Sequence, residues 1–238
     1  MLPTPAPPRL PPLAWVALAL AAAVLGLAHA WVTVVRPGVE RFTFDSAEYA
    51  LAGRAWLEPG RLETPFVYPA QLRGAHGPPF PLLAGHPLVP ALDALAFAIA
   101  GPTPDATLAP SLLAFVACVL LVARLALALA GSRIAALGAA AAFALSPWAL
   151  GLACEGRSEM PFAALLTGAL LLLWEFPTSP RPLALGIVLG LAHLARPAAR
   201  AARRRAPSRA SFRLPCSPRS TSGRRPATRS PARPATCS

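Results

Sequence analysis

The chain has 238 residues, of which 55% are hydrophobic and only 13% are charged. This composition is too apolar for an ordinary soluble domain of this length and makes a soluble enzyme a poor interpretation. The formal net charge of +12 belongs entirely to the tail, because residues 1–195 hold ten Arg and ten acidic residues whereas residues 196–238 hold twelve Arg and no acidic residue.

The first predicted element is a transmembrane helix over residues 13–35, which follow a Pro-rich cytoplasmic start at residues 1–12. The stretch is uncharged and long enough to cross the hydrocarbon core. Ala28-His29-Ala30 also has the form of a signal-peptide cleavage site, so removal of this stretch stays an alternative. In both cases the following residues lie outside the cytoplasm.

Residues 36–108 are expected to form a structured external loop. Apolar residues at helical spacing predict a short helix from Ser46 to Leu57, ended by Pro59-Gly60. The apolar piece 80–100 contains His86-Pro87, Pro90 and Asp93, which are costly in lipid. We therefore expect an amphipathic or re-entrant segment there, with a full crossing as the alternative.

Four further transmembrane helices are expected within residues 109–197, at 109–130, 134–152, 160–174 and 182–195. This topology places Arg124, Arg133 and Arg181 at or near cytoplasmic ends, in agreement with the positive-inside tendency. A full crossing at 80–100 would place these arginines outside. The expected fold is thus an all-α integral membrane protein, a multi-span helical bundle with a structured external first loop.

The tail, residues 198–238, is rich in Arg, Pro, Ala and Ser and is expected to be disordered. Such a composition is typical of a GC-rich gene translated out of frame, so a frameshift near residue 200 is one interpretation, and a basic tail on the membrane surface is the other. Phe212 is the only aromatic residue there, which argues against a nucleic-acid partner.

Two groups of residues in the external loop are candidates for chemistry. Asp45, Glu48 and Tyr49 have the spacing i, i+3, i+4, which places them on one helix face just outside the first transmembrane helix. A carboxylate there could act as a base, or Asp45 could simply cap the helix with Glu48 in a capping box. His76, in His76-Gly-Pro-Pro79, could bind a phosphate or sugar hydroxyl, or could belong to an ordinary loop-to-helix junction.

A second candidate cluster follows the third predicted transmembrane helix. Glu155 and Glu159 flank Arg157, either as an interface anchor or as a phosphate ligand with acidic neighbours. Arg196 ends the last helix on the external side, against the positive-inside tendency, or snorkels there as an ordinary end-of-helix arginine. No metal cage is predicted from spacing, although acidic oxygens could hold a divalent cation.

The order of these motifs resembles the amino-terminal part of the GT-C fold membrane glycosyltransferases. The resemblance is to the branch of the dolichyl-phosphate-mannose protein mannosyltransferases and the lipid A aminoarabinose transferases. It covers about residues 13–197 and is carried by Asp45-Ser-Ala-Glu-Tyr49, His76-Gly-Pro-Pro79, Leu-Ser146-Pro147, Arg157-Ser-Glu159 and Ala-Arg196-Pro197.

The resemblance implies transfer of a sugar from a polyprenyl-phosphate donor to an acceptor on the external face of a bacterial inner membrane. Asp45 would be the base, with Glu48 as a second catalytic carboxylate and Arg157 or Arg196 stabilising the departing phosphate. Substrate binding is expected from Tyr49, His76, Glu155, Arg157, Glu159 and Arg196. Because relatives continue through more helices, an inactive fragment is a second form of this hypothesis, and a non-enzymatic transporter fragment or assembly subunit is the alternative.

Overall fold

The structure, a computed structural model, describes residues 9–33, 43–57, 63–64, 80–81, 86–177 and 180–196. His76 and the tail 198–238, about which predictions were made, lie outside these residues. The described chain is mostly helical, as predicted, and its elements are α1 (Pro12–Thr33), α2 (Phe44–Leu57), β1 (Glu63–Thr64), β2 (Phe80–Pro81), α3 (Leu88–Ala100), the 3-10 helix η2 (Ala106–Leu108), α4 (Ala109–Ala130), α5 (Arg133–Ala144), α6 (Pro147–Cys154), α7 (Glu159–Glu175) and α8 (Pro182–Ala195).

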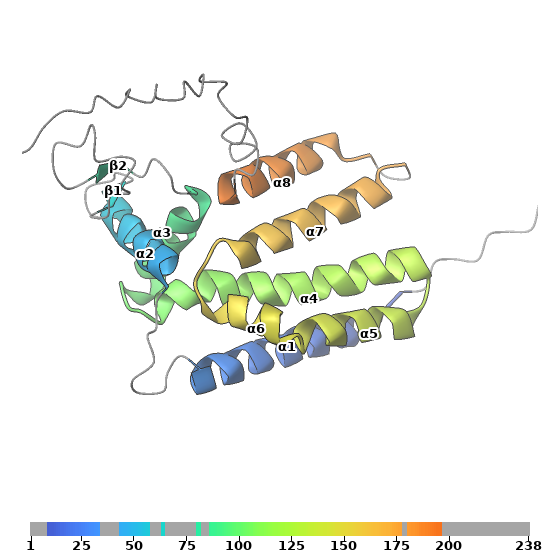
Figure 1. The fold of residues 1–238 in the computed structure, drawn as a ribbon. Coiled ribbons are helices and arrows are strands. Elements are labelled where there is room, and N and C mark those ends of the chain that lie inside the picture. The colour runs from blue at the N-terminus through green and yellow to red at the C-terminus, as the bar shows by residue number, and fades with distance from the viewer. Residues whose placement is uncertain are drawn as a thin grey trace, which may run out of the picture.

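The long helices lie side by side, with α4 in contact with α1, α5 and α7, and with α8 packed on α7 (Figure 1). Helices α2 and α3 pack against each other beyond one end of this assembly, next to the short antiparallel pair β1 and β2, in which Glu63 lies opposite Pro81. We call this end the α2–α3 end. Helices α4 and α7 begin there, and α1, α6 and α8 end there.

Two helices are long and apolar enough to cross a membrane, namely α1 and the continuous helical stretch Ala106–Ala130. At 1.5 Å per residue the 22-residue α1 spans about 33 Å, which covers a hydrocarbon core of about 30 Å. Helices α3 and α8 have only 13 and 14 residues, about 20 Å each, and are therefore both shorter than this core.

The helix expected at 134–152 is instead a broken pair, α5 and α6, bent by 57°. Pro147 has no N–H to continue the hydrogen-bond ladder, and the Ser146 hydroxyl accepts a hydrogen bond from the Ala149 N–H at 3.5 Å to start a new helix. The pair counts as a third membrane crossing only if both halves are taken as one span.

The core lies along α4 and consists largely of small side chains. Phe115, Val119 and Ala123 of α4 are fully buried, together with alanines of α1, α5 and α6. A Cβ atom on Gly26 would lie 3.2 Å from Leu112 Cδ2, which shows how closely α1 approaches α4. Small residues at contacts between helices are typical of packing in membranes.

Large apolar side chains cover much of the outer surface. Ile134 is 84% exposed, Leu183 is 77% exposed and Trp148 is 70% exposed. A water-soluble monomer rarely exposes so much contiguous apolar surface. Together with the two apolar helices, this surface indicates association with a membrane.

Candidate functional site at the α2–α3 end

The first carboxylate of the site lies in the first turn of α2. Thr43 begins the helix, because its hydroxyl accepts a hydrogen bond from the Ser46 N–H at 3.3 Å. Asp45 is therefore a residue inside the first turn and not the N-cap, so the capping-box interpretation of Asp45 with Glu48 is wrong in detail. The Asp45 side chain is 46% exposed, and its Oδ2 atom lies 3.5 Å from Nη2 of Arg157.

A tight turn between α6 and α7 presents Glu155 and Arg157 to that carboxylate. Gly156 has φ +63°, and a Cβ atom there would lie 3.2 Å from the Thr107 carbonyl oxygen. The Ser111 hydroxyl donates a hydrogen bond to the Arg157 carbonyl oxygen at 3.3 Å. The turn is thus fixed against η2 and the start of α4.

Arg157 is the centre of an ion-pair cluster. Its guanidinium lies 3.0 Å from Glu155 Oε2, 3.2 Å from Glu159 Oε1 and 3.5 Å from Asp45 Oδ2. Arg196, at the end of α8, lies 3.7 Å from Glu159 Oε1. Residues far apart in the sequence therefore form one cluster of three carboxylates and two guanidinium groups, with one negative charge in excess.

Burial by itself would lower the pKa of Arg157, but the hydrogen bond with Glu155 and the charges of Glu159 and Asp45 outweigh it and raise this pKa. Arg157 stays charged. Its side chain is 30% exposed, and Arg157 Nε and Glu159 Oε2 are buried atoms without a hydrogen-bond partner. The cluster thus keeps one donor and one acceptor atom unused at its centre.

Tyr49 and His86 are two uncharged aromatic side chains that lie next to the ion-pair cluster. Tyr49 is 5% exposed, and its ring centroid lies 6.2 Å from that of His86. Burial raises the pKa of Tyr49 to about 12, and a side-chain hydrogen bond with Ser158 works in the opposite direction. Tyr49 is therefore a neutral phenol that joins α2 to the turn before α7.

Burial, followed by the charge of Arg196, lowers the pKa of His86, so the imidazole is neutral at pH 7. Its Nδ1 atom is buried and has no hydrogen-bond partner. Sequence reasoning missed His86 and Ser158 as members of the site. The signal for His86 was present, since His86-Pro87 was an unexpected polar feature of an apolar segment.

Two further acidic residues near the site, the candidate Glu48 and the additional residue Asp93, are buried. Glu48 is 2% exposed and lies on α2 close enough to Tyr49 to contribute to the raised pKa of that phenol. Asp93, on α3, is 1% exposed with neither carboxylate oxygen hydrogen-bonded, and burial raises its pKa to about 8. Among the described residues no group of three or more His, Cys, Asp or Glu side chains could hold a metal ion.

No family model, curated protein or solved structure matches the chain. The arrangement of its own residues is therefore the basis for a proposal about function.

Proposed function

We propose that the protein is a multi-pass membrane glycosyltransferase of the GT-C type, which transfers a sugar from a polyprenyl-phosphate donor to an acceptor outside the cytoplasm. The observation that carries the proposal is the contact of Asp45 with Arg157 inside the cluster of Glu155, Glu159 and Arg196. A candidate base and two cations meet at one end of an apolar helical assembly, where a lipid-linked phosphate would lie.

The chemistry of transfer needs both kinds of group. Asp45 accepts the proton of the acceptor hydroxyl while the hydroxyl oxygen attacks the anomeric carbon of the sugar. The bond from that carbon to the phosphate oxygen breaks, and its electron pair leaves with the lipid phosphate. Guanidinium groups at the site stabilise the negative charge that develops on the phosphate.

Arg196 is the cation best able to meet the donor phosphate. Arg157 already pairs with three carboxylates, whereas Arg196 has one ion pair within the described part of the chain, at 3.7 Å from Glu159, and a side chain that is 49% exposed. Arg157 then serves mainly to hold Asp45 and Glu159 in place. Neutral His86, with its unpaired Nδ1 atom, is suited to bind a hydroxyl of the sugar or acceptor.

The distribution of charge supports an external site. Arg124 lies in the C-terminal half of α4, Arg133 begins α5 and Arg181 precedes α8. Figure 1 shows these ends of the three helices opposite α2 and α3. The three described arginines at the α2–α3 end, Arg54, Arg157 and Arg196, are outnumbered there by acidic residues, so the excess of positive charge lies at the opposite end. Positive residues favour the cytoplasmic side, so the Asp45 cluster would face outward. In this arrangement α5–α6, α7 and α8 complete five crossings with α1 and α4, and α3 lies at the outer interface.

The alternative, a transporter fragment or an assembly subunit, predicts a different placement of acidic residues. Transporters hold ionisable groups near the middle of the bilayer, between packed helices. Among the described residues, Asp45, Glu48, Asp93, Asp105, Glu155 and Glu159 lie at the α2–α3 end and Glu175 at the opposite end. Glu48 and Asp93 are buried, but on α2 and α3 and not between the long helices. This placement favours the transferase.

The test is the release of polyprenyl phosphate from a panel of polyprenyl-phosphate hexoses and pentoses by the reconstituted protein, with membrane lipid extract as acceptor. Asp45→Asn should lower release about 100-fold or more, the usual effect of losing a general base, while membrane insertion is unchanged. Asp105→Asn, an exposed acidic residue before η2, is the matched control and should retain full activity. Equal turnover by Asp45→Asn and the wild type would refute the role of Asp45, and failure of every donor would favour the non-enzymatic alternative.

A further inference from the structure

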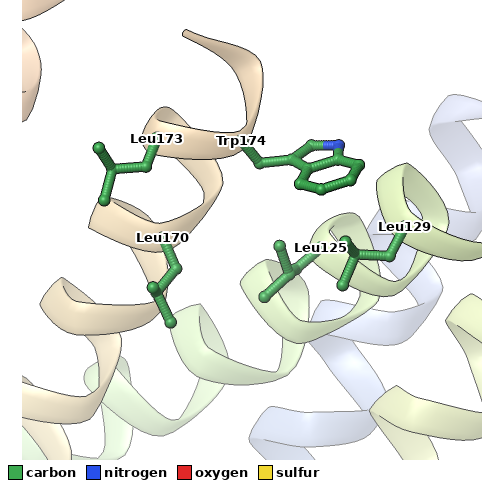
Figure 2. Close-up of a pocket in the computed structure, with 5 residues that line it drawn as sticks. All are labelled: Leu125, Leu129, Leu170, Leu173 and Trp174. Carbon is green, nitrogen blue, oxygen red and sulfur yellow. The ribbon is translucent and has the colours of Figure 1, made fainter.

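An apolar groove of about 410 Å³ lies between the C-terminal halves of α4 and α7. Figure 2 shows its lining, with Leu170 and Trp174 from α7 facing Leu125 and Leu129 from α4, and with Leu173 beside Trp174 at the rim. The indole of Trp174 reaches across toward Leu129. Trp174 is 54% exposed and Leu129 is 56% exposed, so the groove opens to the surroundings of the protein.

Charged side chains lie at this groove. Arg124 precedes Leu125, and its Nη2 atom lies 3.0 Å from Oε1 of Glu175, which follows Trp174. The Arg124 side chain is 49% exposed, so a planar group with five N–H donors also faces outward. Arg133 begins α5 and Arg181 precedes α8 at the same end of the assembly. This end of the described chain is therefore basic.

We propose that this groove binds one acyl chain of an anionic phospholipid, with the lipid phosphate on Arg124. The occupant follows from the two kinds of surface that meet there: a leucine-lined channel along the helices fits a hydrocarbon chain, and a guanidinium at its edge fits a phosphate. A tryptophan at the same edge is typical of the boundary between hydrocarbon and headgroups. The site depends on membrane insertion and is independent of the proposed transferase activity.

The experiment measures quenching of Trp174 fluorescence by brominated lipids. A variant that keeps Trp174 as its only tryptophan is reconstituted in phosphatidylcholine vesicles with a minor fraction of brominated phosphatidylglycerol or of brominated phosphatidylcholine. We expect stronger quenching by the anionic lipid. Arg124→Gln should lower the relative binding constant of the anionic lipid about fivefold, the effect of one Lys or Arg near an anionic membrane.

Two variants serve as controls. Arg54→Gln removes an arginine of α2, at the other end of the assembly, and should leave the preference unchanged. A protein that keeps only Trp148, which is 70% exposed on α6 away from the groove, should be quenched equally by both lipids and so shows that insertion is normal.

Equal quenching of Trp174 by the two brominated lipids overturns the proposal, as does an anionic preference that survives Arg124→Gln. Quenching of Trp148 without any quenching of Trp174 also overturns it, because a protein helix would then cover the groove. Loss of the preference in Arg124→Gln alone supports it.

Discussion

At the scale of single residues, the position of Arg157 depends on a glycine that has no functional group. Gly156 adopts φ +63°, where a side chain is strained, and a Cβ atom would also lie 3.2 Å from the Thr107 carbonyl oxygen. We expect Gly156→Ala to lower the free energy of unfolding by about 1–2 kcal/mol and to displace Arg157 from Asp45.

The midpoint of thermal unfolding in detergent micelles measures this effect. Gly138→Ala is the matched control, because Gly138 lies in α5 with nothing within 4 Å of an added Cβ atom. That substitution should be neutral or stabilising, since alanine favours a helix over glycine. A Gly156→Ala protein as stable as the control would contradict the strained turn.

Asp93 provides a second prediction, on pH dependence. Burial raises its pKa from 3.8 to about 8, so the folded state holds a proton that the unfolded chain has already lost. The stabilising contribution is fully present below pH 3.8 and is lost as the pH rises through 8. We expect the stability of the wild type to fall across this window.

Asp93→Asn and Asp93→Leu should both flatten that fall, and each should be more stable than the wild type at alkaline pH, on the order of 2 kcal/mol. Thermal midpoints of the three proteins across the pH window measure the difference. Two variants are needed because an asparagine amide buried here would bring its own unpaired groups. Parallel pH profiles of all three proteins would contradict the raised pKa, because they would mean that Asp93 has the same pKa in the folded and the unfolded state.

Residues that carry charge in an apolar chain are easily found from sequence, which is why Asp45, Glu155, Arg157, Glu159 and Arg196 could all be selected. Their spatial neighbours were harder to find. In the sequence, His86 stands out only as a polar residue that is costly in lipid. Its contact with Tyr49 depends on how α3 packs against α2, which the sequence does not show. No periodicity within either segment contains that information.

At the scale of elements, the packing of α2 on α3 positions the Asp45 side of the site. The helices approach at Gly53, where an added Cβ atom would lie 2.9 Å from the Pro90 carbonyl oxygen and 2.9 Å from Asp93 Cβ. Backbone cannot move aside as a flexible side chain can. Gly53→Ala should therefore separate the helices and cost about 1–3 kcal/mol of stability.

Thermal unfolding of Gly53→Ala in detergent micelles tests this contact, with Gly186→Ala in α8 as the control, because nothing lies within 4 Å of a Cβ atom there. We also expect Gly53→Ala to lower the proposed transferase activity, since α2 carries both Asp45 and Tyr49. A protein with wild-type stability and activity would show that α2 and α3 tolerate separation.

Helices of this chain were predicted well where one long apolar stretch determines them, as for α1 and α4. The boundary between α5 and α6 was not predicted, although Ser146-Pro147 is a recognisable stop and restart signal. The hydropathy profile does not reveal this boundary, because the residues on both sides of it are equally apolar. Bends inside membrane helices depend on such local hydrogen bonding, which an average over a window cannot detect.

At the scale of the whole molecule, the decisive question is which end faces the cytoplasm. The described basic residues Arg124, Arg133 and Arg181 lie toward one end, and the Asp45 cluster lies at the other. The positive-inside tendency predicts that the cluster faces outward, as proposed above. Two exposed prolines, Pro102 between α3 and η2 and Pro177 after α7, mark the two ends.

We expect Pro102→Cys, in a chain whose native cysteines are replaced by serine, to react with a membrane-impermeant maleimide on intact bacterial spheroplasts. Pro177→Cys should react only after the membrane is permeabilised, because it lies at the arginine-bearing end. The reverse pattern would place the Asp45 cluster in the cytoplasm, where an external acceptor is out of reach, and would overturn the proposed direction of transfer. Labelling of both cysteines from outside would mean that one of the three segments α4, α5–α6 and α7 does not cross, so that the number of crossings and not only their direction would have to be revised.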